Sequence, residues 1–176
     1  FFFSGRGRTT IFLTLTGGCN AAAPVFFFFG ERGRELKEFL EHELDEELKS
    51  RTIMVCATSD RSSMERSRAA FTATSIAESL RDKGQKVLLL VDSLTRFARA
   101  QREIGLANGE PPAKGGFPPS VYTMLPKLIE RAGITTRGSI TAVYTVLVEG
   151  EATSDPIAEE AKSLLDGHIY LSRKLA

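Results

Sequence analysis

The stretch Lys86–Asp92, KVLLLVD, is the strongest strand signal in the sequence, because an unbroken aliphatic run is followed by a carboxylate. A short apolar run of this kind is typical of a strand buried on both faces, as in parallel sheets that helices cover on each side. A segment with helical periodicity, Met64–Leu80, precedes it and is closed by Gly84. The stretch therefore predicts an α/β fold in which Asp92 lies where a buried strand ends.

The same alternation of strand and helix patterns runs along the rest of the chain. Expected strands are 25–29, 52–57, 139–148 and 168–171, and expected helices are 34–49, 64–80, 120–132 and 157–165. Glycine and proline predict a loop over 108–119. This order predicts one domain, residues 1–176, with a mainly parallel sheet covered by helices on both faces. Because such domains rarely begin with a helix, we expect that part of an earlier strand is missing at the N-terminus.

Composition narrows the class of protein. The 176 residues are 42% hydrophobic and carry a formal net charge of +1, so a core can form. The basic excess typical of nucleic-acid binders is lacking, and we expect no nucleic-acid partner. No apolar run approaches the roughly 20 residues of a membrane span, and no signal-peptide pattern opens the chain. Cys19 and Cys56 are expected as reduced thiols in the core of a cytosolic protein, and His42 and His168 show no ligand pattern.

Two phenylalanine runs, Phe1–Phe3 and Phe26–Phe29, are unusual for a strand. Successive side chains of a strand point to opposite faces, so each run needs room for large rings on both sides of the sheet. Two explanations are open at this point. Either a sheet covered on both faces holds the rings, or the recorded sequence contains errors at these runs.

The segment Ser4–Thr10, SGRGRTT, has the character of a phosphate-binding loop. Glycines let several backbone N–H groups face one anion, and the N-terminus of the following helix adds partial positive charge. In such loops a lysine reaches the outer phosphates and the next hydroxyl binds magnesium. Here the hydroxyl is Thr9, but Arg8 stands at the lysine position and Phe2 stands at the first glycine position. The planar guanidinium does not fill a compact ammonium pocket without moving the phosphate, so an ordinary turn before a helix is the alternative.

The carboxylate of Asp92 is the first of two candidate acids. An acid at the carboxyl end of a parallel strand lies at the edge where ligands bind in open α/β sheets, and there it can hold magnesium directly or through water. The alternative is that Asp92 caps the helix that begins near Ser93. The two roles are compatible.

Glu31 is the second candidate acid, because it follows another buried strand and could polarise an attacking water. Its neighbour Arg32 could hold it ionised and oriented, whereas a plain position in an exposed loop is the alternative. Arg96, Arg99 and Arg102 recur one turn apart after Asp92. Such arginines either face phosphate groups, offsetting their charge, or form ion pairs along the helix.

Several long segments together resemble the type III secretion ATPases of injectisomes and the flagellar export ATPase, which are relatives of the catalytic subunit of rotary ATP synthases. They are GERGRELKEFLE, ATSDRSSMERSRAAFTATSIAE, VDSLTRFARAQREIGLANGEPP, FPPSVYTMLPKLIERAG, GSITAVYTVLVEGE and DGHIYLSRKLA. Their fixed order covers almost the whole chain from Gly30 to Ala176. Shared fold alone does not produce such a match.

The resemblance implies a RecA-like P-loop fold that binds ATP and Mg²⁺. By this resemblance Glu31 orients the attacking water, Arg32 lies near the phosphates, Arg96 lies near the γ-phosphate, and Asp92 lies on the magnesium side. The implied nucleotide-binding residues are Ser4, Gly5, Arg6, Gly7, Arg8, Thr9 and Thr10, with Thr9 also on the metal. Residues 1–176 would be the core domain, incomplete at both ends, without the family's N-terminal β-barrel and C-terminal helical domains.

The resemblance also implies a biological setting. Family members form homohexameric rings in the cytoplasm, peripheral to the inner membrane beneath the export gate. They work with stalk and regulator proteins, release chaperones from their substrates and unfold those substrates for export. We expect these partners for this chain as well.

Departures from the family pattern limit the expected activity. Arg8 replaces the lysine, and Glu151 remains where the family has an acidic pair. The chain also ends before the stretch that carries the arginine finger and the adenine-stacking aromatic residue. Two other functions therefore stay open: a catalytic subunit of a rotary proton-translocating ATPase, against which the segments 92–107 and 166–176 weigh, and a remnant that binds nucleotide without turnover.

Overall fold

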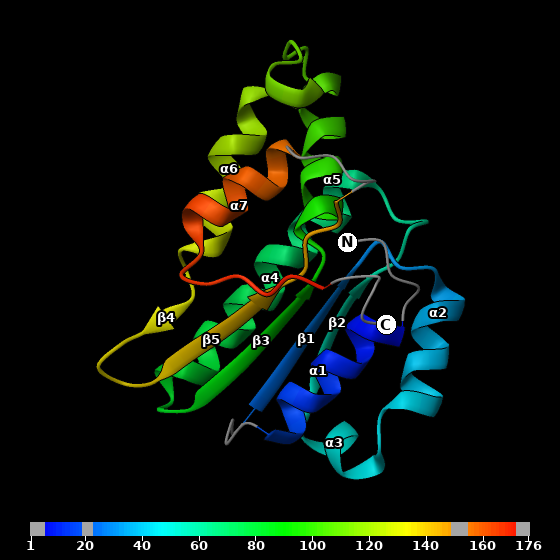
Figure 1. Cartoon of the computed structure of the whole chain (residues 1–176), viewed down its shortest axis with the longest axis vertical. Helices are drawn as coiled ribbons and strands as arrows, with labels where there is room; N and C mark the ends of the chain where they lie inside the picture. Colours follow the sequence, from blue (N-terminus) through cyan, green and yellow to red (C-terminus); the bar gives the residue numbers. More distant parts are fainter. Residues whose placement is uncertain (1–5, 19–22, 149–154, 172–176) are drawn as a thin grey trace.

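A mainly parallel sheet runs through the molecule (Figure 1). The computed structural model describes residues 6–18, 23–148 and 155–171, and of residues 6–10 and 12 it describes the backbone alone. In these residues the strand order is β2-β1-β3-β5-β4, with β4 antiparallel to β5 and the other neighbours parallel. The strands are β1 (Ala23–Phe29), β2 (Ile53–Ala57), β3 (Lys86–Asp92), β4 (Gly133–Ile134) and β5 (Ser139–Tyr144). The predicted α/β class is thereby confirmed.

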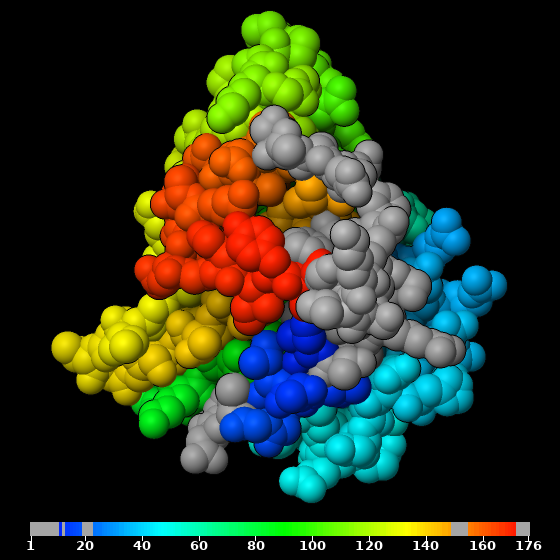
Figure 2. Space-filling model, in the orientation of Figure 1, coloured from blue at the N-terminus to red at the C-terminus, as the bar shows by residue number. Residues whose placement is uncertain are grey.

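Helices cover both faces of this sheet (Figure 1). On one face lie α1 (Arg6–Gly18), α2 (Gly33–Glu38), the π-helix η1 (Phe39–Glu43) and α3 (Glu46–Arg51). On the other face lie α4 (Ser63–Asp82), α5 (Leu94–Ala107), α6 (Pro119–Ile129) and α7 (Pro156–Leu164), with a short 3₁₀ turn, η2 (Lys114–Gly116), before α6. In the view of Figures 1 and 2 the segment after α7, drawn in red, appears above α1, drawn in blue.

The run Phe26–Phe29 is buried along its whole length. Phe26 and Phe28 pack with Phe39, with ring centroids 5.9 and 4.8 Å apart, on the face of α1–α3. Phe27 and Phe29 point to the face of α4–α7, where Phe29 meets Phe97 at 6.0 Å. Fully burying each ring contributes about 1.5–3 kcal/mol. The covered sheet therefore accommodates this run, whereas Phe1–Phe3 lie outside the described residues.

Serine side chains cap the starts of two of the helices on the face of α4–α7. Ser62 is the N-cap of α4, and Glu65 completes a capping box with it. Ser93 is the N-cap of α5. The glycine- and proline-rich loop is confirmed between α5 and α6, because α6 begins only at Pro119.

The single helix predicted over 34–49 is wrong. The segment divides into α2, η1 and α3, and Leu44 N donates to Phe39 O, five residues back, at 3.3 Å. The Asp45 side chain then accepts from Leu48 N at 2.6 Å and caps a new helix. Because Phe39, Leu44 and Leu48 all reach the same buried cluster, the chain bends around the sheet instead of running past it.

Two predicted strands also differ from the structure. The strand expected over 139–148 ends at Tyr144, and the following residues leave the sheet to bond with the start of α5, where Leu94 N donates to Thr145 O at 2.9 Å. Residues 168–171 form no strand, and Ile169 and Tyr170 there are exposed. An apolar pattern favours a strand, but residues 168–171 form one only if another strand lies beside them to pair with. The short strand β4 was not predicted.

Cys56 is exposed, which contradicts the prediction of a core thiol. It lies on β2, the edge strand of the described sheet, where one flank has no strand to cover it. Partial burial nevertheless raises the pKa of the Cys56 thiol. Cys19 lies outside the described residues. Among the residues that the structure places, no helix is long and apolar enough to cross a membrane, and no group of His, Cys, Asp and Glu could hold a metal by itself.

Candidate nucleotide site

The carboxyl ends of the parallel strands meet at one edge of the sheet. Phe29 of β1 is opposite Ala57 of β2, and Phe28 is opposite Asp92 of β3. Glu31 follows β1 directly, so both candidate acids lie at this edge. In open α/β sheets this is the edge at which ligands bind.

Glu31 is held by an arginine from α5. Gly30, with a φ of +64°, turns the chain out of β1, and the Glu31 that follows is only 7% exposed. Arg96 Nη1 lies 3.0 Å from Glu31 Oε1 and donates to the carbonyl oxygen of Phe29 at 3.2 Å. One guanidinium thus bridges the end of β1 and the carboxylate, and its charge compensates that of a buried acid.

The cation beside Glu31 is therefore Arg96, not the adjacent Arg32. Arg32 is exposed and occupies the N-cap position of α2. Of the other two arginines on α5, Arg99 is exposed, and Arg102 turns to the following loop, where it donates to Gly116 O at 2.8 Å. Sequence proximity favoured Arg32, whereas the fold brings the first turn of α5 to the end of β1.

Asp92 is 4% exposed and is the last residue of β3. Thr145 Oγ1 donates to Asp92 Oδ1 at 2.7 Å. The alternative role of Asp92 as a helix cap is not observed, because Ser93 caps α5 by accepting from Arg96 N at 3.4 Å. A buried, oriented carboxylate at the ligand edge is the type of oxygen donor that Mg²⁺ takes from proteins.

Thr145 was not among the predicted site residues. It lies one residue past the end of β5, next to β3 in the sheet. A hydroxyl residue at the end of a strand is the available sequence signal. The signal was missed because the strand was expected to continue to residue 148.

The predicted phosphate loop lies where a helix begins. The backbone of Arg6–Thr10 forms the start of α1, so part of the segment stands at a helix N-terminus, where backbone N–H groups favour an anion. Ser4 and Gly5 lie outside the described residues, as do the side chains of Arg8 and Thr9. The assignment of this loop therefore stays a prediction.

Comparison with known proteins places the chain in a family. The model of the ATP synthase alpha/beta family, nucleotide-binding domain, matches residues 1–176. This chain belongs to the ATP synthase alpha/beta family. The resemblance noted in the sequence is confirmed, because relatives within the family include both injectisome and flagellar ATPases.

Similar family members come from several bacteria. The chain is 66% identical over 173 residues to the type 3 secretion system ATPase of Pseudomonas syringae pv. tomato, covering 98% of this chain and 38% of that protein. It is 54% identical to the SPI-2 type 3 secretion system ATPase of Salmonella typhimurium and 51% identical to the flagellum-specific ATP synthase of Bacillus subtilis, each over 98% of this chain and 40% of the relative. The chain thus spans about two fifths of the length of these curated relatives.

Solved structures of the family share the fold. A prototypical ATPase from the type III secretion system of pathogenic bacteria matches with a TM-score of 0.92 at 53% identity, over 98% of this chain and 49% of that one. The assembled ATPase EscN of enteropathogenic E. coli matches with a TM-score of 0.90 at 53% identity, over 98% of this chain and 42% of that one. The fold is therefore that of the P-loop ATPases in this alpha/beta family.

Proposed function

We propose that this chain is the nucleotide-binding core of an ATPase that powers type III protein secretion, and that it binds and hydrolyses MgATP. The observation that carries the proposal is the pair of buried carboxylates at the carboxyl edge of the parallel sheet. Glu31 is ion-paired with Arg96, and Asp92 accepts from Thr145. Burying two acids at one edge is costly unless they serve a ligand or are compensated.

Glu31 would orient the water that attacks the γ-phosphate. A carboxylate that accepts a proton or a hydrogen bond from a water molecule raises the nucleophilicity of that water. The guanidinium of Arg96 lies beside this carboxylate at the end of β1, and by the family resemblance it would lie near the γ-phosphate. Arg32, exposed at the start of α2, would contact the phosphates, as the family resemblance implies.

Asp92 and Thr9 would hold Mg²⁺. The ion supplies positive charge that offsets the charge on the phosphate oxygens during transfer. Support for this role comes from Asp92, which is buried and accepts a hydrogen bond from Thr145; Thr9 lies in the first turn of α1. The hard oxygen atoms of a carboxylate and a hydroxyl are suitable donors.

The segment Ser4–Thr10 would bind the phosphates through backbone N–H groups at the start of α1. Arg8 provides the cation in place of lysine. Its guanidinium is planar and longer, so we expect weaker transition-state stabilisation than a lysine gives. In this family a further arginine comes from the neighbouring subunit, and loss of such a residue typically costs roughly 10³–10⁵ in rate. The isolated chain should therefore turn over slowly.

Self-association and a stalk partner belong to the same proposal. Among similar proteins, EscN has been seen assembled and in complex with its central stalk EscO. We expect the full protein to form a homohexameric ring beneath the export gate at the inner membrane, to bind stalk and regulator proteins, and to release chaperones from substrates that it unfolds. The higher identity to injectisome ATPases than to the flagellar relatives favours an injectisome.

Two measurements test the proposal: calorimetric titration with ATP, with and without magnesium, for binding, and a phosphate-release assay for turnover. Three proteins are compared: the wild-type chain, Arg8→Lys and Asp92→Ala. We expect magnesium-dependent binding by wild type, loss of that dependence in Asp92→Ala, and tighter binding with faster phosphate release in Arg8→Lys. Absence of binding by all three would contradict the assignment of the site. Binding by all three without phosphate release would instead identify a remnant that has lost turnover.

A further inference from the structure

A hydroxyl next to the metal-binding carboxylate comes from the neighbouring strand segment. Thr145 Oγ1 lies 2.7 Å from Asp92 Oδ1 and 3.5 Å from the carbonyl oxygen of Val91. A threonine hydroxyl has one hydrogen to donate. The contact at 2.7 Å is the stronger of the two, because the one at 3.5 Å is at the limit for a hydrogen bond, so the hydrogen is donated to Asp92.

The backbone of Thr145 is fixed from two sides. Its N–H donates to Val91 O at 3.0 Å, and its carbonyl oxygen accepts from Leu94 N at 2.9 Å. The next residues continue this docking, because Leu147 N donates to Thr95 Oγ1 at 2.8 Å. The segment after β5 is therefore attached to the start of α5. Since threonine is β-branched and has few side-chain rotamers, the backbone sets the direction of the Thr145 hydroxyl.

We propose that Thr145 is a positioning residue, which holds the Asp92 carboxylate in the orientation that binds Mg²⁺ with the nucleotide. The inference rests on the proposed function, because it concerns the same metal site. Groups that hydrogen-bond to metal ligands fix the orientation of those ligands and are needed for full metal affinity. Without the hydroxyl, Asp92 loses the hydrogen bond that Oδ1 accepts from Thr145.

The same hydrogen bond links the metal site to α5. Thr145 bonds to Asp92 through its side chain and to the first residue of α5 through its carbonyl oxygen. Arg96, which is paired with Glu31, lies in the first turn of that helix. Thr145 thus sets the position of the metal-binding acid relative to the element that holds the water-orienting acid.

Magnesium titrations of three variants of the whole chain test this role. Thr145→Val keeps the shape of the side chain but removes the donor, and Thr145→Ser restores a donor. The matched control is Thr141→Val, the same substitution at an exposed position on β5, the strand that Thr145 follows. ATP affinity is measured by calorimetry as a function of magnesium concentration and again in EDTA.

We expect Thr145→Val to raise the magnesium concentration for half-maximal ATP affinity by roughly 10-fold to 100-fold. Its ATP affinity in EDTA should equal that of wild type, and both Thr145→Ser and Thr141→Val should stay near wild type. If Thr145→Val does not fold, Thr145→Ala is compared with Thr145→Ser. These two variants differ only in the hydroxyl group, and both lack the γ-methyl group.

The other outcomes overturn the inference in distinguishable ways. Wild-type magnesium dependence in Thr145→Val would leave the proposed function intact and remove the role of Thr145. Equal weakening with and without magnesium, or no recovery in Thr145→Ser, would show that the residue only supports packing. A wild-type chain whose ATP affinity ignores magnesium would overturn the proposed function and this inference together.

Discussion

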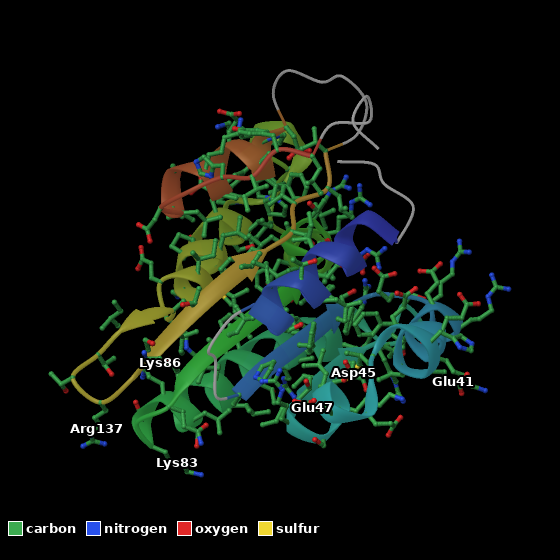
Figure 3. The ribbon with its side chains drawn as sticks, turned by 60° about the horizontal axis from the view of Figure 1, so that its bottom comes forward. Glu41, Asp45, Glu47, Lys83, Lys86 and Arg137 are labelled. Atoms are coloured by element: carbon green, nitrogen blue, oxygen red, sulfur yellow. The ribbon has the colours of Figure 1, made fainter. Side chains whose placement is uncertain are left out.

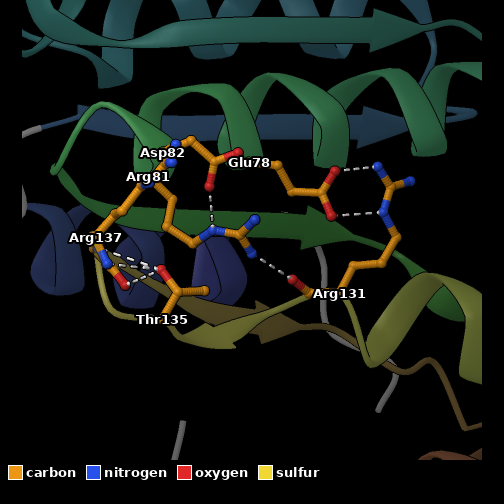
Figure 4. A network of polar contacts seen from close by, with 7 residues as sticks. Glu78, Arg81, Asp82, Arg131, Thr135 and Arg137 are labelled. Atoms are coloured by element: carbon orange, nitrogen blue, oxygen red, sulfur yellow. Dashed lines mark hydrogen bonds and ion pairs between the residues drawn. The ribbon is translucent and has the colours of Figure 1, made fainter.

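One arginine–glutamate pair lies at the carboxyl ends of the parallel strands (the carboxyl edge), and another lies toward their amino ends (the amino edge). The contacts within the two pairs differ. At the carboxyl edge Arg96 Nη1 lies 3.0 Å from Oε1 of Glu31, whose side chain is 9% exposed. Toward the amino edge Arg131 donates to both carboxylate oxygens of Glu78, through Nε and Nη2 (Figure 4). Arg131 Nη2 also donates to Ser75 Oγ at 2.8 Å. The side chains of Arg131 and Glu78 are 27% and 25% exposed.

The rest of the amino edge consists of a side-chain contact to the backbone, tightly packed backbone segments and exposed charged residues. Arg81 Nη1 donates to the carbonyl oxygen of Arg131, and a Cβ at Gly138 would come within 2.5 Å of backbone oxygens of Arg81 and Gln85. Lys83 and Lys86 extend from this edge (Figure 3). The comparison indicates that the amino edge is shaped for stability. On our proposal, the buried acids of the carboxyl edge, Glu31 and Asp92, are placed for a ligand.

Charge removal at the two glutamates should affect turnover very differently. We expect Glu31→Gln to lower kcat by roughly 10²–10⁴, because the water loses its orienting carboxylate. Glu78→Gln, the same change at the other edge, should leave kcat near the wild-type value. Phosphate release at saturating MgATP measures both. Full turnover in Glu31→Gln would remove Glu31 from the mechanism.

Removal of Arg96 should destabilise the fold through its buried partner. Arg96→Ala takes the compensating charge from Glu31, and we expect the free energy of unfolding to fall by about 1–3 kcal/mol. In the double variant Glu31→Gln/Arg96→Ala part of this loss should be recovered, because the acid is then neutral. Urea unfolding of the two single variants and the double variant measures the coupling. Strict additivity would show that the two side chains do not interact.

The amino-edge pair should contribute a smaller, pH-dependent stability. Hydrogen bonds from Arg131 hold the pKa of Glu78 below its ordinary value of 4.5. A lowered folded-state pKa gives stability that is present above the ordinary value and lost as the pH falls through the folded value. We expect Glu78→Gln to cost about 1 kcal/mol near pH 7. The difference from wild type should shrink in unfolding experiments below pH 4.5, and a constant difference would contradict the assignment.

An exposed ion pair provides the lower limit of the comparison. Arg34 Nε lies 3.9 Å from Glu38 Oε1 on α2, and the side chains are 79% and 65% exposed. Arg34→Ala should change the free energy of unfolding by less than about 0.5 kcal/mol, because solvent screens such pairs. A larger effect would mean that charge alone, not burial and geometry, determines the ranking of the three pairs.

The layered fold could be predicted from the sequence because its signals are local. The apolar run of β3 and the capping box of α4 each indicate their own element. The breaks at Leu44 and Tyr144 could not be predicted in this way, because they depend on where a segment meets its neighbours. Leu44 turns into a cluster beneath the sheet, and the chain after Tyr144 bonds to α5.

The same distinction between local and tertiary signals applies to the candidate site. Glu31 and Asp92 were predictable, since each acid follows a buried strand and parallel strands end at one edge. Their partners were not, because Arg96 reaches Glu31 from 65 residues further along the chain and Thr145 reaches Asp92 across 53 residues. Which side chains meet is a property of the tertiary structure. The adjacent Arg32, instead of Arg96, was therefore predicted from the sequence as the partner of Glu31.

The most direct test of the central claim is to locate the nucleotide by nuclear magnetic resonance. MnATP is added to the ¹⁵N-labelled chain, and paramagnetic broadening, which falls steeply with distance from the ion, is followed at each amide. The account predicts early broadening at Glu31, Ser93 and Thr145, with the amides of Glu78 and Gly138 unaffected. Early broadening at the amino edge, or equal broadening at both edges, would contradict a nucleotide site at the carboxyl ends of the strands.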